Sequence, residues 1–409
     1  MKKTEINNYF DEYAKMWAFS GSISAVKDGE VVFENSYGYS NIEHKIDNQS
    51  DTRYRIWSIT KQFTAAAILL LEERGLLKVE DFINDYFDSE FDSRITIHHL
   101  LNHTSGIFNY SDMEKSHEEF QRHEHTQSEL LEMFSKKELD FEPGEGWNYS
   151  NSGYYVLGML IERLSGMSYG AFLEENIFAP LNMRGTGVDD GKTLIENKAT
   201  GYYLDKENLI HCNYINMELM LSSGAMYSTI TDLQKWSSGL MNEKVISSAS
   251  LKKMTTAYKG NYGYGLFINE GQGRVSHGGG CEGFLTELHM YKEKGLSIAI
   301  LSNYGFTAVY KLCEVLAAMI QGQDCEKLEK PKEIANGLSD EYIGIYEEED
   351  FKLEVIKTEV GYTLIMDNVT HLPSYATAEN TLHHSWIDED YTFEKDDKNE
   401  ISIWGVAKI

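Results

Sequence analysis

The chain has 409 residues and a formal net charge of −28, from 37 basic and 65 acidic side chains. This acidity argues against nucleic acid or an anionic membrane surface as a partner, because both bind basic protein surfaces. The length exceeds the usual limit of a single hydrophobic core, so we expect one large domain and a smaller one. No apolar run approaches the length that spans a bilayer, so no membrane segment is expected.

The N-terminus and the cysteines favour a reducing compartment. The first three residues, Met-Lys-Lys, are followed by polar residues rather than by the apolar core of a signal peptide. The cysteines show neither metal-site nor disulfide spacing; they are Cys212, Cys281, Cys313 and Cys325. We therefore expect a cytoplasmic protein, and the sequence carries no signal for its oligomeric state.

The predicted elements change along the chain from helices to consecutive strands. A β-hairpin with an Asp-Gly turn is predicted over 23–39, after a short amphipathic helix over 4–17. Further helices are predicted over 58–75, 95–107, 128–134, 152–164, 231–241 and 309–320. Further strands are predicted over 199–213, 262–268, 283–291 and 296–303. This order predicts an α+β fold with an antiparallel sheet.

Ser58 and Lys61 are the first candidate catalytic residues. They open a long apolar helix one turn apart, where residues i and i+3 project toward the same spot. A serine hydroxyl needs a neighbouring base, and a lysine can serve once burial lowers its pKa. The helix N-terminus disfavours the ammonium and offers N–H groups to an oxyanion. Ser-x-x-Lys also begins at Ser24 and Ser250, so the pattern alone fits an N-cap serine beside a solvated lysine as well.

Two later motifs carry the other groups that an acyl-transfer site needs. Tyr149 and Asn151 precede a predicted helix; a phenol can carry a proton between nucleophile, lysine and leaving group, and an amide can fix a substrate. The His-Gly-Gly-Gly run at 277–280 precedes a predicted strand. Glycines there allow a substrate to lie against the strand edge and leave a backbone N–H free. A glycine-rich turn with an incidental histidine is an equal alternative for this run.

The C-terminal part is predicted to be a separate module. We expect a serine hydrolase domain over 1–325, a polar linker over 326–337 and a small β-rich domain over 338–409. Short strands split by acidic turns fill the last segment, and it carries no chemical motif. A structural appendage or a lid is the simplest interpretation.

The order Ser-x-x-Lys, Tyr-Ser-Asn and His-x-Gly is the layout of the penicillin-recognising serine hydrolases. Over 15–320 the chain resembles the family of class C β-lactamases, DD-peptidases, D-aminopeptidases and related esterases. The segments that carry this resemblance are 55–65, 95–107, 141–154, 223–233 and 301–305.

This resemblance implies an antiparallel sheet packed between helices beside a helical region, with the site in the cleft between them. It implies that Ser58 is acylated, that Lys61 and Tyr149 share the proton transfers, and that Asn151 holds the substrate amide. The N–H groups of Ser58 and Gly280 would form the oxyanion hole. The substrate is a small molecule or a peptide, and no metal or organic cofactor is expected.

The sequence departs from the β-lactamase pattern at His277 and Gly279, which we place among the substrate-binding residues. Efficient β-lactamases and carboxypeptidases usually carry Lys-Thr-Gly there, so a permanent cation and a hydroxyl are replaced by a titratable imidazole and a hydrogen. We therefore favour an esterase or a D-amino-acid peptidase or amidase. The alternatives are a β-lactamase, a DD-carboxypeptidase and a non-catalytic penicillin-binding sensor.

A histidine cluster near the middle of the chain offers a zinc site as a further alternative. His99 and His103 are four residues apart, with His98 beside them. The acidic motif that accompanies such pairs is missing, so we do not expect a metal.

Overall fold

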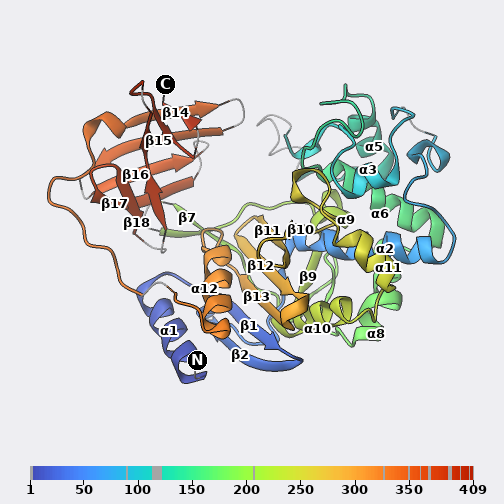
Figure 1. The fold of residues 1–409 in the computed structure, drawn as a ribbon, viewed down its shortest axis with the longest axis horizontal. Helices are drawn as coiled ribbons and strands as arrows, with labels where there is room; N and C mark the ends of the chain where they lie inside the picture. Colours follow the sequence, from blue (N-terminus) through green and yellow to red (C-terminus); the bar gives the residue numbers. More distant parts are fainter. Residues whose placement is uncertain are drawn as a thin grey trace.

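The computed structural model has a large α+β part and a β-rich C-terminal part (Figure 1). It describes residues 3–88, 91–112, 122–205, 208–325, 328–348, 351–359, 361–366, 370–385, 389–396, 398–404 and 406–408. Within these ranges, no helix is both long enough and apolar enough to cross a bilayer. Residues 326 and 327 of the expected linker lie outside the described residues.

A six-stranded antiparallel sheet forms the centre of the large part. Its strands, in spatial order, are β10 (Phe267–Asn269), β11 (Arg274–Cys281), β12 (Phe284–Tyr291), β13 (Leu296–Ser302), β1 (Gly21–Lys27) and β2 (Glu30–Tyr37). The N-terminal hairpin thus joins the last strand of the large part, with Ser24 opposite Ala299. Asp28 and Gly29 have φ angles of 52° and 84°, which confirms the predicted turn.

Helices cover both faces of this sheet. On one face, Ile23 and Ile298 are fully buried in a core that α1 (Lys3–Met16) and α12 (Val309–Gln321) complete. On the other face, the alternate residue Ala299 belongs to the larger core, against α10 (Ile230–Met241). Successive side chains of β13 therefore belong to two different cores, because neighbouring side chains of a strand lie on opposite faces of the sheet. The predicted sheet between helices is confirmed (Figure 1).

The helical region is built around α2 (Thr60–Glu73). Its first ten residues are all buried, although Thr60, Lys61, Gln62 and Thr64 among them are polar. Among the described residues of the large part, the other α-helices are α3 (Ile97–Leu101), α5 (Gln127–Ser135), α6 (Asn151–Ser165), α7 (Tyr169–Leu173), α8 (Ala179–Leu181), α9 (Leu221–Gly224) and α11 (Ser248–Met254). Both α6 and α9 pack directly against α2.

Short strands connect these helices to the sheet. They are β3 (Tyr39–Asn41), β4 (Ile46–Asp47), β5 (Tyr54–Arg55), β6 (Gly187–Val188), β7 (Tyr202–Asp205), β8 (Asn208–His211) and β9 (Met226–Ser228). The order β5-β9-β6 places the segment before Ser58 beside the segment after α9. This pairing brings parts of the chain that are far apart in sequence to one site.

The C-terminal part is a second antiparallel sheet with its own core. Its strands follow in sequence order: β14 (Gly344–Glu348), β15 (Phe351–Thr358), β16 (Gly361–Met366), β17 (Thr370–Ala378), β18 (Thr381–His384) and β19 (Asp390–Thr392). A small sheet of β20 (Glu394–Lys395), β21 (Ile401–Ile403) and β22 (Val406–Ala407) follows. The two parts meet where β17 contacts β7 and where the rings of Trp17 and His383 lie 5.1 Å apart.

Four local predictions were wrong in extent. The strand expected over 199–213 is instead two short strands, β7 and β8. The helix expected over 95–107 covers only Ile97–Leu101, because His103 and Gly106 have φ angles of 62° and 72°. The strand expected over 262–268 shrinks to β10. The glycine run at 277–280 lies within β11 rather than before a strand.

Candidate active site

Ser58 lies in a short 3₁₀ turn, Trp57–Ile59 (η1), and not in the first turn of α2 as expected. Trp57 has a φ of 46°, a left-handed conformation that is rare for a bulky residue. The indole is buried, and the Arg55 guanidinium lies 5.7 Å from its ring. Packing on both sides of the turn therefore fixes the backbone that presents the Ser58 hydroxyl.

The Lys61 side chain is buried and lies against Ser58. Its Nζ is 3.2 Å from Ser58 Oγ, 2.7 Å from Asn151 Oδ1 and 2.8 Å from the Ser223 carbonyl oxygen. A neutral amine has two N–H donors and one lone pair. If Asn151 and Ser223 accept the two N–H groups, the lone pair is left for the Ser58 hydroxyl proton. The arrangement matches a lysine that acts as a base.

Burial lowers the pKa of Lys61 well below its ordinary value of 10.5. The residue is 0% exposed, and desolvation is the cause of the shift. The strongly acidic composition of the chain would favour the charged ammonium, but local burial outweighs it. A lowered pKa is what a lysine needs in order to act as a base.

Tyr149 lies on the other side of the lysine. Its ring centroid is 4.7 Å from Lys61 Nζ. The Tyr149 hydroxyl is buried and forms no hydrogen bond of ordinary geometry with a described residue. The nearby Ser58 side chain lowers the pKa of this hydroxyl. Burial is the larger effect and raises the pKa of Tyr149 well above 10. A protonated phenol therefore faces the serine and the lysine.

Asn151 begins α6, and its side chain bridges two partners. Its Oδ1 accepts from Lys61, while its Nδ2 donates to Ser111 Oγ over 2.9 Å. Asn109 fixes this corner, since its Oδ1 accepts from the Asn151 backbone N–H over 3.0 Å and from Ser111 Oγ over 2.9 Å. Among the described residues, the other N–H of the Asn151 amide has no acceptor, so it is available to a substrate.

The edge of β11 supplies a backbone N–H at Gly280. The two-residue turn between β11 and β12 has φ angles of 38° and 74°, and Cys281 pairs with Phe284 across it. In such a hairpin the closing pair is hydrogen bonded, and antiparallel pairs alternate between bonded and non-bonded. Gly280 is therefore in a non-bonded pair, with its N–H directed away from β12. β10 pairs with β11 only as far as Ser276 and leaves that edge free.

Gly279 holds β11 against the turn that carries Ser58. A Cβ there would lie 2.1 Å from the Ile56 carbonyl oxygen, so only glycine fits. Thr286 Oγ1 joins the two segments, because it lies 3.2 Å from the Ile56 carbonyl oxygen and 3.1 Å from that of Gly279. This close approach sets the distance between the N–H of Gly280 and the nucleophile.

His277 is buried in the wall of the site with both ring nitrogens engaged. Nε2 is 2.9 Å from the Tyr262 hydroxyl, and Nδ1 is 2.6 Å from the Gly278 carbonyl oxygen. Burial and the charge of Lys61 lower the pKa of His277 to about 3. The imidazole is thus neutral and supplies no cation to a substrate.

The structure brings the predicted residues Ser58, Lys61, Tyr149 and Asn151 into direct proximity, and the free edge of β11 is held against the same turn. The Ser223 carbonyl was missed, because a backbone acceptor has no sequence signature. The amide of Asn109 and the hydroxyl of Ser111 were missed as well. The only sign of them in the sequence is that they closely follow residues 95–107, a segment that resembles the family.

The three clustered histidines form hydrogen bonds within the protein, and His99 Nδ1 accepts the Thr96 N–H over 3.3 Å. The ring nitrogens of His98 lie 2.6 Å from the Tyr264 hydroxyl and 3.0 Å from Asn102 Nδ2. His103 Nδ1 accepts the Ser150 N–H. In the part of the chain that the structure describes, no group of three His, Cys, Asp or Glu side chains is arranged to hold a metal ion.

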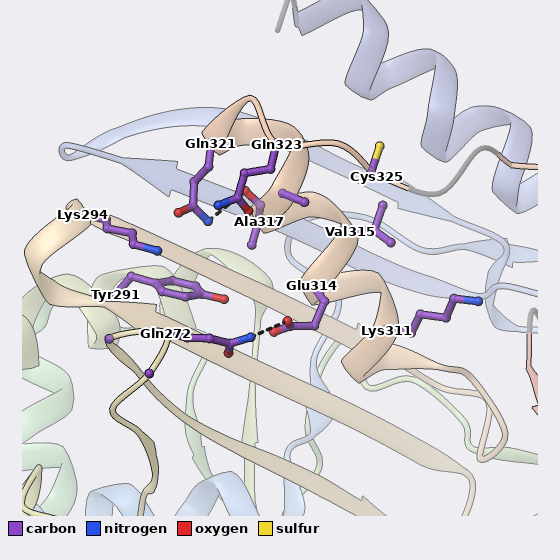
Figure 2. Close-up of a pocket in the computed structure, with 13 residues that line it drawn as sticks. Gln272, Tyr291, Lys294, Lys311, Glu314, Val315, Ala317, Gln321, Gln323 and Cys325 are labelled. Carbon is purple, nitrogen blue, oxygen red and sulfur yellow. Dashed lines mark hydrogen bonds between the residues drawn. The ribbon is translucent and has the colours of Figure 1, made fainter.

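A cavity of about 680 Å³ lies away from this site, between α12 and the ends of β11 and β12. Figure 2 shows Gln272 donating to Glu314 across it, with Tyr291 and Lys294 on the strand side. None of the candidate catalytic residues lines this cavity. It therefore contributes nothing to the chemistry at Ser58.

A family model described as Beta-lactamase matches residues 6–313. The chain belongs to the beta-lactamase family. This membership confirms the resemblance that the motifs predicted and the fold that it implied.

Relatives in this family cover most of the chain. Penicillin-binding protein 4* of Bacillus subtilis (strain 168) is 29% identical over 88% of this chain and 86% of its own length. The octameric penicillin-binding protein homologue from Pyrococcus abyssi has a TM-score of 0.70 and 25% identity, covering 100% of this chain and 99% of that one. A D-stereospecific amidohydrolase from Streptomyces sp. has a TM-score of 0.67 and 25% identity, covering 79% of this chain and 100% of its own. The neighbours thus include both penicillin-binding proteins and a hydrolase.

Proposed function

We propose that this chain is a serine hydrolase that forms an acyl-enzyme on Ser58 and cleaves a D-amino-acid amide or an ester. The observation that carries the proposal is the buried Lys61 Nζ, 3.2 Å from Ser58 Oγ and held by two further acceptors. A non-catalytic binder needs no such base. Family membership and the Streptomyces amidohydrolase neighbour support the hydrolase class.

In the first step, Ser58 Oγ attacks the carbonyl carbon while its proton passes to neutral Lys61. The tetrahedral oxyanion is stabilised by the N–H groups of Ser58 and Gly280. Asn151 orients the substrate through its remaining N–H. Each group acts where charge develops, within a site from which much of the water is excluded.

In the second step, the ammonium of Lys61 returns the proton toward the leaving group through the Tyr149 hydroxyl. The bond from the carbonyl carbon to the leaving amine or alcohol breaks, and an ester on Ser58 remains. Water, deprotonated by the same pair of groups, then hydrolyses that ester and releases the acid. The burial that lowers the pKa of Lys61 and raises that of Tyr149 suits both groups to this relay.

The substrate assignment rests on His277. It occupies the motif position at which a lysine would meet a substrate carboxylate, and it is buried, neutral and fully engaged. A charge-assisted hydrogen bond is worth about 1.5–3 kcal/mol, so its absence disfavours penicillins and peptides that end in a carboxylate. D-Amino-acid amides and simple esters do not need that contact. Besides the hydrolysis of amides and esters, slow hydrolysis of β-lactams is a second candidate activity.

The proposal is tested by initial rates with a p-nitrophenyl ester and a D-amino-acid p-nitroanilide. We expect Ser58→Ala to lose at least about 10³-fold in rate, because the nucleophile is gone. Ser24→Ala is the matched control: it begins another Ser-x-x-Lys, in β1, and its buried hydroxyl has no hydrogen-bond partner among the described residues. It is expected to keep the unsubstituted rate.

Equal rates for the unsubstituted protein and Ser58→Ala would contradict the nucleophile assignment. Rapid hydrolysis of nitrocefin through Ser58 would keep the nucleophile but overturn the substrate class. Both outcomes are measured by comparing the unsubstituted protein with Ser58→Ala.

A further inference from the structure

His103 takes no part in the proposed mechanism, yet it is built into the wall of the site behind Tyr149. It is 1% exposed, and its φ of 62° is unusual for a residue with a side chain. We propose that His103 is the positioning residue of Tyr149, which holds the phenol beside Ser58 and Lys61. The inference rests on the proposed function of Ser58.

His103 binds the backbone on both sides of Tyr149. The Asn148 N–H donates to the His103 carbonyl oxygen over 3.1 Å, and the Ser150 N–H donates to its Nδ1 over 3.1 Å. Tyr149 is the single residue between these two donors. Its Cα therefore cannot shift without breaking a bond to His103, and one of the two is a buried bond to the ring itself.

The imidazole also packs against the phenol. The ring centroids of His103 and Tyr149 are 4.4 Å apart, with 42° between the planes. Two further tyrosine rings enclose the imidazole, Tyr262 at 4.6 Å and Tyr154 at 5.1 Å. One residue thus fixes both the backbone and the ring of Tyr149.

The hydrogen bonds also define the protonation state that this role requires. Because Nδ1 accepts the Ser150 N–H, a neutral ring carries its proton on Nε2. Burial and the nearby Lys61 and His277 lower the pKa of His103 well below 6.5. A protonated ring would lose the bond to Ser150 and add a cation beside the lysine base.

Two substitutions separate the acceptor from the ring. His103→Asn places an amide oxygen where Nδ1 lies, and asparagine tolerates the left-handed backbone, but the ring is lost. His103→Phe keeps a ring and loses the acceptor. Each is made alone and together with Tyr149→Phe, and thermal melts identify variants that fold. Ester kcat and KM are measured, together with the rate at which a fluorophosphonate labels Ser58.

We expect His103→Phe to lower kcat by about 10- to 100-fold with KM changed less than about 2-fold, the scale of a misplaced catalytic group. His103→Asn is expected to recover at least about 5-fold of that loss, because the bond to Ser150 returns. With Tyr149→Phe already present, both substitutions are expected to cost less than about 2-fold, since their effect passes through the phenol hydroxyl. If one of the two His103 variants fails to fold, the other still allows the comparison with and without Tyr149→Phe.

Equal losses with and without the Tyr149 hydroxyl would overturn the inference, because they would reveal a general structural role. If the unsubstituted protein shows no Ser58-dependent hydrolysis and no labelling of Ser58, the proposed function fails and the inference with it. If Ser58 is labelled but the losses from the His103 and Tyr149 substitutions are additive, only the inference about His103 is overturned and the proposed function stands.

Discussion

At the scale of single residues, the proposed chemistry depends on a lysine whose pKa is lowered inside an acidic protein. Lys61 has two acceptors besides Ser58, and desolvation is the cause of its lowered pKa. A net charge of −28 acts from the surface, where water and salt screen it. Burial acts at the nitrogen itself, so it decides the direction of the pKa shift.

This burial makes a prediction for Lys61→Met. Acylation is expected to fall by about 10²- to 10⁴-fold, because the general base is lost. The folded pKa of Lys61 is lowered, so between that value and its ordinary 10.5 the unfolded chain binds more protons than the folded one. The stability of the unsubstituted protein therefore rises with pH in this window. The Lys61→Met variant lacks this pH dependence. The difference in Tm, variant minus unsubstituted protein, is therefore expected to become smaller or more negative as the pH rises from about 7 to about 10.

Thermal melts across this pH range check the prediction, and Lys253→Met is the matched control. Lys253 also ends a Ser-x-x-Lys pattern, but it pairs with Glu72 and its pKa is raised, so its replacement is expected to give no such slope below pH 10.5. A Tm difference for Lys61→Met that does not change with pH would contradict a lowered pKa.

At the scale of elements, the site depends on how closely β11 approaches the turn η1. The approach is possible because Gly279 has no Cβ to meet the Ile56 carbonyl oxygen. The Thr286 hydroxyl of the neighbouring strand β12 lies within hydrogen-bond distance of a carbonyl oxygen in each segment. A shift of β11 would move the N–H of Gly280 relative to Ser58, and the oxyanion geometry would change with it.

Gly279→Ala is expected to lower kcat/KM by about 10²-fold, the cost of a shift near 1 Å in catalytic geometry. Gly278→Ala is the control one residue away, where the only close neighbour of a new Cβ is the far end of the Glu287 side chain, and the Thr286 carbonyl oxygen lies at an ordinary 3.4 Å. It is expected to keep most of the activity. Ester hydrolysis and thermal melts measure both, and similar activities for the two variants would show that the close approach is not needed.

At the scale of the whole molecule, the acidic charge acts on substrates before they bind. The field of a protein with a net charge of −28 attracts cations and repels anions over a distance set by salt. The Debye length falls from about 30 Å at 0.01 M to about 10 Å at 0.1 M ionic strength. The D-amino-acid amides of the proposed function carry a free ammonium, so this field favours them.

We therefore expect kcat/KM for a D-amino-acid amide to fall as NaCl rises from about 10 mM to about 100 mM. The N-succinylated amide, which is an anion, is expected to show the opposite trend, and a neutral ester is expected to change little. Initial rates with the three substrates measure this. The same trend for all three would mean that salt acts on the fold or the chemistry and not on substrate approach.

The sequence by itself determined the local parts of the site. Ser58 and Lys61 are three residues apart at the start of a helical segment, so their proximity follows from backbone geometry alone. The hairpin with Asp28 and Gly29 was predictable for the same reason, because a two-residue turn fixes its own strands. The order of the motifs then indicated the family.

Only the tertiary structure decided which distant groups meet the lysine. The Asn151 amide and the Ser223 carbonyl lie 90 and 162 residues from Lys61, and the second is a backbone atom that any residue could provide. The burial of His277, with one ring nitrogen bonded to Tyr262, depends on that tyrosine and on the register of β11 against β12. Sequence patterns report the conformation of neighbouring residues. Contacts between distant segments depend on how whole elements pack, and no short pattern encodes that packing.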